Sequence, residues 1–228
     1  MNWFRYSDDL MKGLYNILKL TGIWWLFNVL YAFLGLNLLV APDVASVHTI
    51  VIVGIVLLPF VAIPTTVATL GIARRYVKGD DTFPLFKVFW KYLKRDYVKS
   101  MLLGILNATV LFAFYLAFRY YSGLSSLLEN VFYVLVVVTP FFFLYVYCYL
   151  VDQELPLKNY LTNTMFLLVI HPMNSIFMIL DAVVAAYIMW LVFPPLLLFI
   201  LPGLTALIVT YFFQKSMSVE IQKKHLEK

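Results

Sequence analysis

The sequence has few of the residues from which catalytic and metal sites are built. Among its 228 residues it contains one cysteine and three histidines, and only 13% of its residues are charged. A single cysteine excludes an internal disulfide and a cysteine cluster for a metal, and Cys148 lies in an apolar run, as expected of a small buried hydrophobic residue. The sequence also lacks a glycine-rich phosphate loop. We therefore expect a non-enzymatic protein without a cofactor or a metal.

Apolar surface is what the sequence has in excess. Hydrophobic residues make up 63% and aromatic residues 18% of the chain, and the mean hydropathy is +0.89. A chain of this length cannot bury so much apolar surface inside a water-soluble globule, so lipid must solvate much of it. Too little polar sequence remains for a separate water-soluble domain. We expect one all-α domain, residues 1–228, in the lipid bilayer.

Positive charge is sorted along the chain. Sixteen of the seventeen lysine and arginine residues fall in segments that hydropathy places on one side of the membrane, and Arg119 is the exception. Because cytoplasmic loops retain lysine and arginine, this pattern predicts a multi-pass protein of the cell membrane with both termini in the cytoplasm. Contact with anionic lipid explains the net charge of +5 without nucleic acid as a partner.

The hydropathy pattern predicts a membrane helical bundle of about six transmembrane helices. Kinks are expected at prolines inside the spans, such as Pro59 and Pro64, because proline removes a backbone donor. Residues 161–170 are apolar but too short to cross a bilayer, which predicts an interfacial or half-inserted helix. The expected order is an interfacial helix 1–19, a first helix pair 20–78, a basic amphipathic helix 79–99, a second pair 100–151, a connection 152–172, a third pair 173–213 and a cytoplasmic tail 214–228.

The segment 79–99 has the pattern of an amphipathic helix at the cytoplasmic surface. Apolar residues recur with helical spacing on one face and basic residues on another. Buried rings and snorkelling lysines would anchor such a helix to the membrane. The alternative is a docking helix for a cytoplasmic or membrane partner. Both interpretations depend on the same residues, which are Phe86, Lys87, Phe89, Trp90, Lys91, Leu93, Lys94 and Arg95.

Asp181 is the one acidic residue deep inside a predicted span. An unpaired charge at this depth is costly, so Asp181 is a functional candidate, as a proton or cation site or as a contact to a partner subunit. It could line a polar cavity together with polar residues of other spans, namely Asn28, Asn107, Thr65 and Thr66. The alternative is that these groups form hydrogen bonds between helices, each worth about 1 kcal/mol, without any substrate.

Two stretches of the sequence are distinctive, namely residues 61–70 (VAIPTTVATL) and 73–81 (ARRYVKGDD), followed by Phe86, Phe89 and Trp90. They resemble the YesL family, small integral membrane proteins of Gram-positive bacteria. Residues 24–28, 103–104 and 202–204 extend the resemblance over most of the chain. This chain has Ile63 where relatives tend to carry glycine before the proline, which argues against a tight helix crossing there.

The YesL resemblance implies a shared membrane fold without an established activity. Relatives are associated with carbohydrate ABC importers, which implies an accessory role beside the permease subunits of such an importer. Our leading interpretation is therefore a non-enzymatic accessory or regulatory protein in the bilayer. The alternative is a stand-alone transporter of a small polar solute or lipid, with Asp181 as its proton or cation site.

Overall fold

The computed structural model describes residues 3–39 and 43–226, and the regular elements in these two stretches are all helical. The elements are α1 (Trp3–Phe27), α2 (Val29–Leu39), α3 (Val44–Leu57), the π-helical turn η1 (Leu58–Ala62), α4 (Ile63–Val77), α5 (Leu85–Tyr121), α6 (Ser126–Asp152), α7 (Leu157–Ile170), α8 (Pro172–Val192) and α9 (Leu196–Leu226). The all-α prediction is confirmed. Residues 1–2 of the predicted first helix, 40–42 of the first pair and 227–228 of the tail lie outside the described residues.

The described helices are those of a multi-pass membrane protein. Five stretches are long and apolar enough to cross a bilayer: Ala45–Val77, Leu85–Tyr121, Ser126–Asp152, Pro172–Val192 and Leu196–Gln222. The segments Leu10–Phe27 and Val29–Gly35 meet the same requirement together as one bent pair. The total of five or six agrees with the prediction of about six spans.

A sharp bend at Asn28 separates α1 from α2. The two helices meet at 76° without a proline. The Asn28 side chain donates a hydrogen bond to the Trp24 carbonyl at 2.8 Å, and also one to Thr65 Oγ1 at 2.7 Å. A side chain that bonds the preceding turn competes with the helical backbone, which favours a break. The chain thus runs as one helix past residue 19, where we predicted a boundary, and bends inside the predicted first span.

The second predicted span consists of α3, η1 and α4 in direct succession. Pro59 has no N–H to donate, and the helix widens here, so that the Ile63 N–H bonds the Leu58 carbonyl in the π pattern. Pro64 lies in the first turn of α4, where the missing N–H is tolerated. The chain leaves α4 through Lys78 and Gly79, and the positive φ of 82° at Gly79 is one that glycine adopts readily.

The predicted amphipathic helix 79–99 and the span after it are one continuous helix. α5 has 37 residues and begins directly after Pro84. No proline interrupts it, and the residues around position 99 favour helix, so nothing ends the helix where we placed a boundary. The amphipathic part is therefore the first half of a rod that continues into the bilayer.

The third predicted pair also extends further than its apolar residues. α8 starts at Pro172, a favoured first helical residue, and α9 follows the Pro194–Pro195 turn. α9 continues to Leu226, so most of the predicted tail 214–228 is helical. Glutamine, lysine and glutamate in this stretch favour helix without an apolar environment. The 14 residues of α7 are too short to cross the bilayer.

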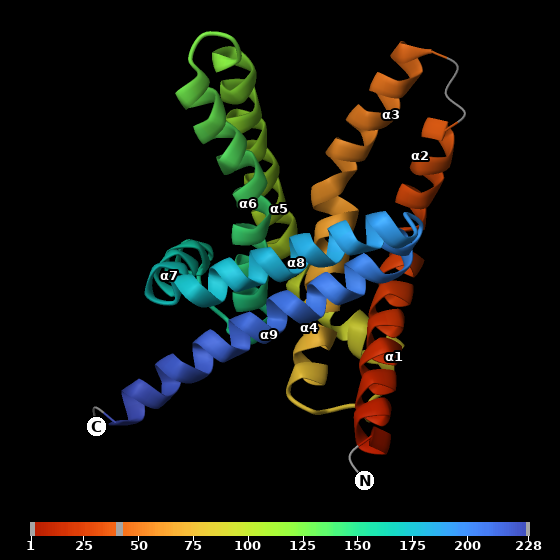
Figure 1. Cartoon of the computed structure of the whole chain (residues 1–228), viewed down its shortest axis with the longest axis vertical. Helices are drawn as coiled ribbons and strands as arrows, with labels where there is room; N and C mark the ends of the chain where they lie inside the picture. Colours follow the sequence, from red (N-terminus) through yellow and green to blue (C-terminus); the bar gives the residue numbers. More distant parts are fainter. Residues whose placement is uncertain (1–2, 40–42, 227–228) are drawn as a thin grey trace.

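The packed core lies where α1, α4, α5, α6 and α9 converge (Figure 1). Its largest fully buried side chains include Tyr145, Tyr160, Phe89 and Phe213. Two helical hairpins, α2–α3 and the distal parts of α5 and α6, extend away from this region at the top of the view. Their large apolar side chains are mostly exposed, for example Phe33, Phe112 and Tyr133. The core therefore holds one half of the molecule together, and lipid must solvate the other half.

Two glycines allow helices to cross closely in the core. A Cβ added to Gly203 of α9 would lie 2.3 Å from the Ile17 carbonyl oxygen of α1. A Cβ on Gly104 of α5 would lie 3.1 Å from Pro59 Cα and 3.2 Å from the Ile63 side chain. The expectation that Ile63 prevents a tight crossing was wrong, because α5 supplies the missing space through Gly104.

Candidate functional site

Two hydrogen bonds connect α1 to α4 near the bend. Asn28 is fully buried, and its side-chain nitrogen donates to Thr65 Oγ1 at 2.7 Å. One turn earlier, Trp24 Nε1 donates to Thr66 Oγ1 at 3.0 Å. Asn28 Oδ1 has no hydrogen-bond partner among the described atoms. Three of the five predicted cavity residues, Asn28, Thr65 and Thr66, thus meet at one helix contact.

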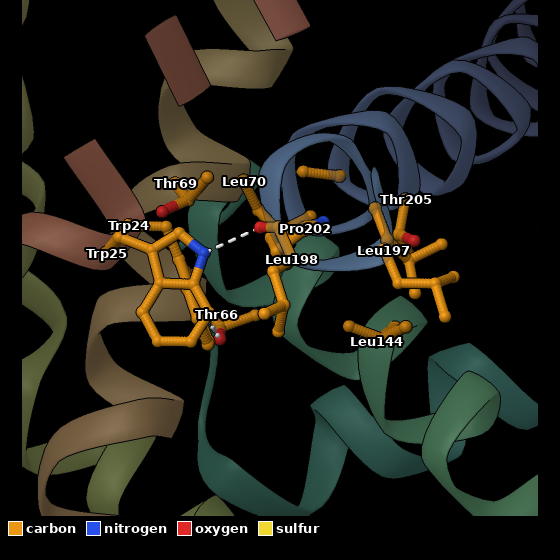
Figure 2. A pocket seen from close by; sticks show the side chains of 12 residues that line it. Trp24, Trp25, Thr66, Thr69, Leu70, Leu144, Leu197, Leu198, Pro202 and Thr205 are labelled. Atoms are coloured by element: carbon orange, nitrogen blue, oxygen red, sulfur yellow. Dashed lines mark hydrogen bonds between the residues drawn. The ribbon is translucent and has the colours of Figure 1, made fainter. Parts of the chain in front are cut away.

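An apolar pocket adjoins this contact (Figure 2). Its volume is about 430 Å³, and side chains of α1, α4, α6 and α9 line it. Trp25 Nε1 donates a hydrogen bond to the Leu198 carbonyl at 2.7 Å, the dashed line that crosses the view in Figure 2. Thr66, Thr69 and Thr205 contribute hydroxyl groups, and no charged residue lines the pocket. These walls suit an uncharged, mainly apolar group.

The two other predicted cavity residues lie elsewhere. Asn107 is buried between α5 and α6, where its side chain donates to the Tyr147 hydroxyl at 3.1 Å. Asp181 is exposed on α8 and has no hydrogen bond or ion pair with any residue that the structure describes. The structure therefore does not bring Asp181 together with Asn28, Asn107 and the threonines.

The predicted docking helix divides into a buried and an exposed face. Phe89 is fully buried, with its ring centre 4.5 Å from that of Phe27, and Leu93 is half-buried. Arg95 donates to Asp96, which is itself buried, and to the Val151 carbonyl at 3.2 Å. Arg95 is nevertheless exposed, as are Phe86, Lys87, Trp90, Lys91 and Lys94. The five exposed residues other than Arg95 present surface to a partner or a lipid.

Sequence reasoning missed a cluster of charged and polar groups at the ends of α4 and α6. The Asp152 carboxylate, at the end of α6, accepts from Arg74 of α4 and lies 3.7 Å from Nζ of Lys78, the residue that follows α4. Gln214 of α9 donates to the same oxygen at 3.1 Å. One sequence signal could have revealed this cluster. Asp152 is an acidic residue at the end of an apolar run, and its charge is opposite to that of the basic stretch that follows the second predicted span. This cluster joins three helices.

A second polar contact links the start of α8 to α9. His171 Nε2 lies 2.9 Å from Glu220 Oε1, and Asn174 donates to Ser216 Oγ at 2.9 Å. Ser175 Oγ donates to the His171 carbonyl and not to its ring, so the described side-chain bond of His171 joins the start of α8 to α9. Among the described residues, no group of three histidine, cysteine, aspartate or glutamate side chains is placed to hold a metal ion.

The variant Asn28→Ala tests whether the contact at the bend stabilises the fold. It removes the bonds to Thr65 and to the Trp24 carbonyl, and we expect a loss of about 1 kcal/mol of unfolding free energy, the usual size for a polar contact between membrane helices. Asn37→Ala is the matched control, because the described bond of the Asn37 side chain stays within its own helix, where it donates to the Phe33 carbonyl at 2.8 Å. Unfolding by titration with sodium dodecyl sulfate in mixed micelles measures both. Equal losses in the two variants would contradict a role for the α1–α4 bond.

Comparisons with known proteins agree with the resemblance seen in the sequence. Residues 17–118 match the family described as "Protein of unknown function, DUF624". The uncharacterized protein YesL of Bacillus subtilis (strain 168) is 26% identical over 173 residues, which cover 75% of this chain and 82% of YesL. The uncharacterized protein YesV of the same organism is 22% identical over 167 residues, 67% of this chain and 77% of YesV. No solved structure matches. This chain is therefore similar to the DUF624 family over residues 17–118, and it is a distant homologue of YesL and YesV.

Proposed function

We propose that this multi-pass membrane protein is a non-enzymatic accessory or regulatory protein that binds a membrane partner through the first half of α5. The observation that supports this is the division of α5 into two faces. Phe89 and Asp96 fix the helix in the core, while the lysines at 87, 91 and 94 remain exposed beside Phe86 and Trp90. A helix held rigidly from behind presents its outer face without an ordering cost.

The exposed face has the composition of a recognition surface. Trp90 is 42% and Phe86 57% exposed, and Lys94 Nζ lies 5.2 Å from the centre of the Trp90 ring. Aromatic side chains supply contact area, and lysines favour partners that carry negative charge. We define this docking face as Phe86, Lys87, Trp90, Lys91 and Lys94. A permease subunit of a carbohydrate ABC importer is the partner that the YesL resemblance implies.

Charge reversal on the docking face tests the proposal. The triple variant K87E/K91E/K94E should reduce at least tenfold the amount of importer permease subunit that is retained after mild crosslinking and purification, because repulsion replaces attraction at the contact. Tagged chain and permease subunit are produced together in the host, and the retained subunit is quantified by immunoblot.

A second triple variant serves as the control for charge. Lys12, Lys158 and Lys215 are also exposed but lie on α1, α7 and α9. K12E/K158E/K215E changes the net charge by the same amount and should leave retention unchanged. If both triples retain the subunit as the unchanged chain does, or if the unchanged chain retains none, the docking proposal fails.

A further inference from the structure

α8 is the least buried of the five continuous spans. Only 11% of its apolar window is buried, against 50% for α6. Met178 and Ala182 are its buried residues, and it packs mainly on α9. In Figure 1, α8 lies across the outside of the bundle with α9 beneath it. Most of its circumference therefore faces lipid or another protein.

Asp181 occupies the middle of this exposed helix. Nine residues of α8 precede it and eleven follow, so the carboxylate lies about 14 Å from one helix end and about 17 Å from the other. Phe177, Val184 and Ile188, at helical spacing on the same side, are all exposed and apolar. Lipid tails cannot solvate a charge at this place, and an unpaired one is expensive.

The described part of the chain offers Asp181 no compensation. No described residue bonds it, and α8 contains no lysine or arginine. On the neighbouring helices, Lys158 lies in the first turn of α7 and Lys215 lies eleven residues before the end of α9, and neither forms a described ion pair with Asp181. Intramembrane carboxylates are characteristically paired with a basic group, and here the chain itself does not supply one.

We propose that the Asp181 face of α8 binds a transmembrane helix of a partner protein that carries a lysine or arginine at mid-bilayer depth. This inference rests on the proposed accessory function and adds a second contact, inside the membrane, to the docking face of α5. Charge complementarity identifies the occupant, because a cation is what the isolated carboxylate lacks. The apolar residues Phe177, Val184 and Ile188 then pack on the partner helix around the ion pair.

A synthetic helix tests this contact independently of any importer. The whole chain, with a donor fluorophore, is reconstituted in phosphatidylcholine vesicles with acceptor-labelled peptides of about twenty leucine and alanine residues, which carry lysine or leucine at the centre. We expect saturable energy transfer with the lysine peptide at a peptide fraction at least tenfold lower than with the leucine peptide. Asp181→Leu should abolish this difference. The variant Asp181→Lys should instead prefer a peptide with a central aspartate.

Controls separate the possible outcomes. Glu129→Gln removes a carboxylate outside α8 and should leave the preference intact. Equal transfer from both peptides, or a preference that survives Asp181→Leu, would overturn the inference. Energy transfer between differently labelled copies of the chain in the absence of peptide, if Asp181→Leu abolished it, would also overturn the inference. The occupant of the Asp181 face would then be a second copy of the chain. K87E/K91E/K94E should still bind the lysine peptide, so a failure of the α5 docking face and a failure here give different results.

Discussion

Gly203→Ala is expected to destabilise the protein more than any other single methyl group added in the core. The new Cβ would lie 2.3 Å from the Ile17 carbonyl oxygen and 2.6 Å from Thr21 Oγ1. The first of these atoms belongs to the backbone of α1 and cannot rotate away, so α1 and α9 must separate. We expect a loss of about 3 kcal/mol of unfolding free energy, together with a smaller monodisperse fraction in size-exclusion chromatography.

The separation also breaks a hydrogen bond at the crossing. The Gly203 N–H donates to Thr21 Oγ1 at 2.9 Å, and both residues are buried. Pro202 precedes Gly203 inside α9 and cannot donate, so this stretch of α9 is already short of backbone donors inside the helix. The threonine of α1 therefore takes part in the backbone bonding of α9, and the two helices depend on each other at this point.

Two glycines of α1 provide the control for Gly203→Ala. A Cβ added to Gly13 or to Gly22 would meet no atom within 4 Å. Alanine has the higher helix propensity, so Gly13→Ala and Gly22→Ala should leave stability unchanged or raise it by up to about 1 kcal/mol each. The same titration with sodium dodecyl sulfate serves all three variants. A loss at Gly203 no larger than at Gly22 would show that α1 and α9 do not cross as closely as the structure has them.

Hydropathy predicted the spans well because each apolar segment carries its own signal. A helix that crosses lipid must satisfy its backbone internally, so twenty apolar residues predict a span whatever lies beside them. The boundaries were less predictable, because they depend on local bonds. The bend at Asn28 arises from a side chain that bonds both its own helix and Thr65 of α4. α5 continues past residue 99 because the sequence has no signal that ends a helix there. The change in polarity near this residue had led us to predict a boundary.

The candidate site was predictable only as a set of residue types. Polar residues within spans are rare enough to be noticed, but sequence alone does not indicate which helices meet. Asn28 and Thr65 are in contact, Asn107 bonds Tyr147 instead, and Asp181 faces outward from α8. Phe89 illustrates the same limit, because helical spacing assigned it to an amphipathic face without showing that Phe27 covers it.

Asp152→Asn is expected to have the second largest effect, because it removes the negative charge that joins α4, α6 and α9. The side chain of Asp152 is 13% exposed and contacts Arg74, Lys78 and Gln214. Asparagine keeps the size but not the charge, so two cations would face each other without compensation. Removing one partner of a largely buried ion pair costs about 3 kcal/mol.

The pair between Arg75 and Asp80 supplies a matched comparison for Asp152→Asn. Its atoms are 3.2 Å apart, but its side chains are 34% and 42% exposed, so water already solvates both charges. Asp80→Asn should therefore cost less than about 1 kcal/mol. Unfolding of both variants is measured in mixed micelles at low and at high salt, and salt should weaken the exposed pair more than the enclosed one. Equal losses for the two variants would mean that the charge cluster at the end of α6 is solvated, and that apolar packing alone holds α4, α6 and α9 together there.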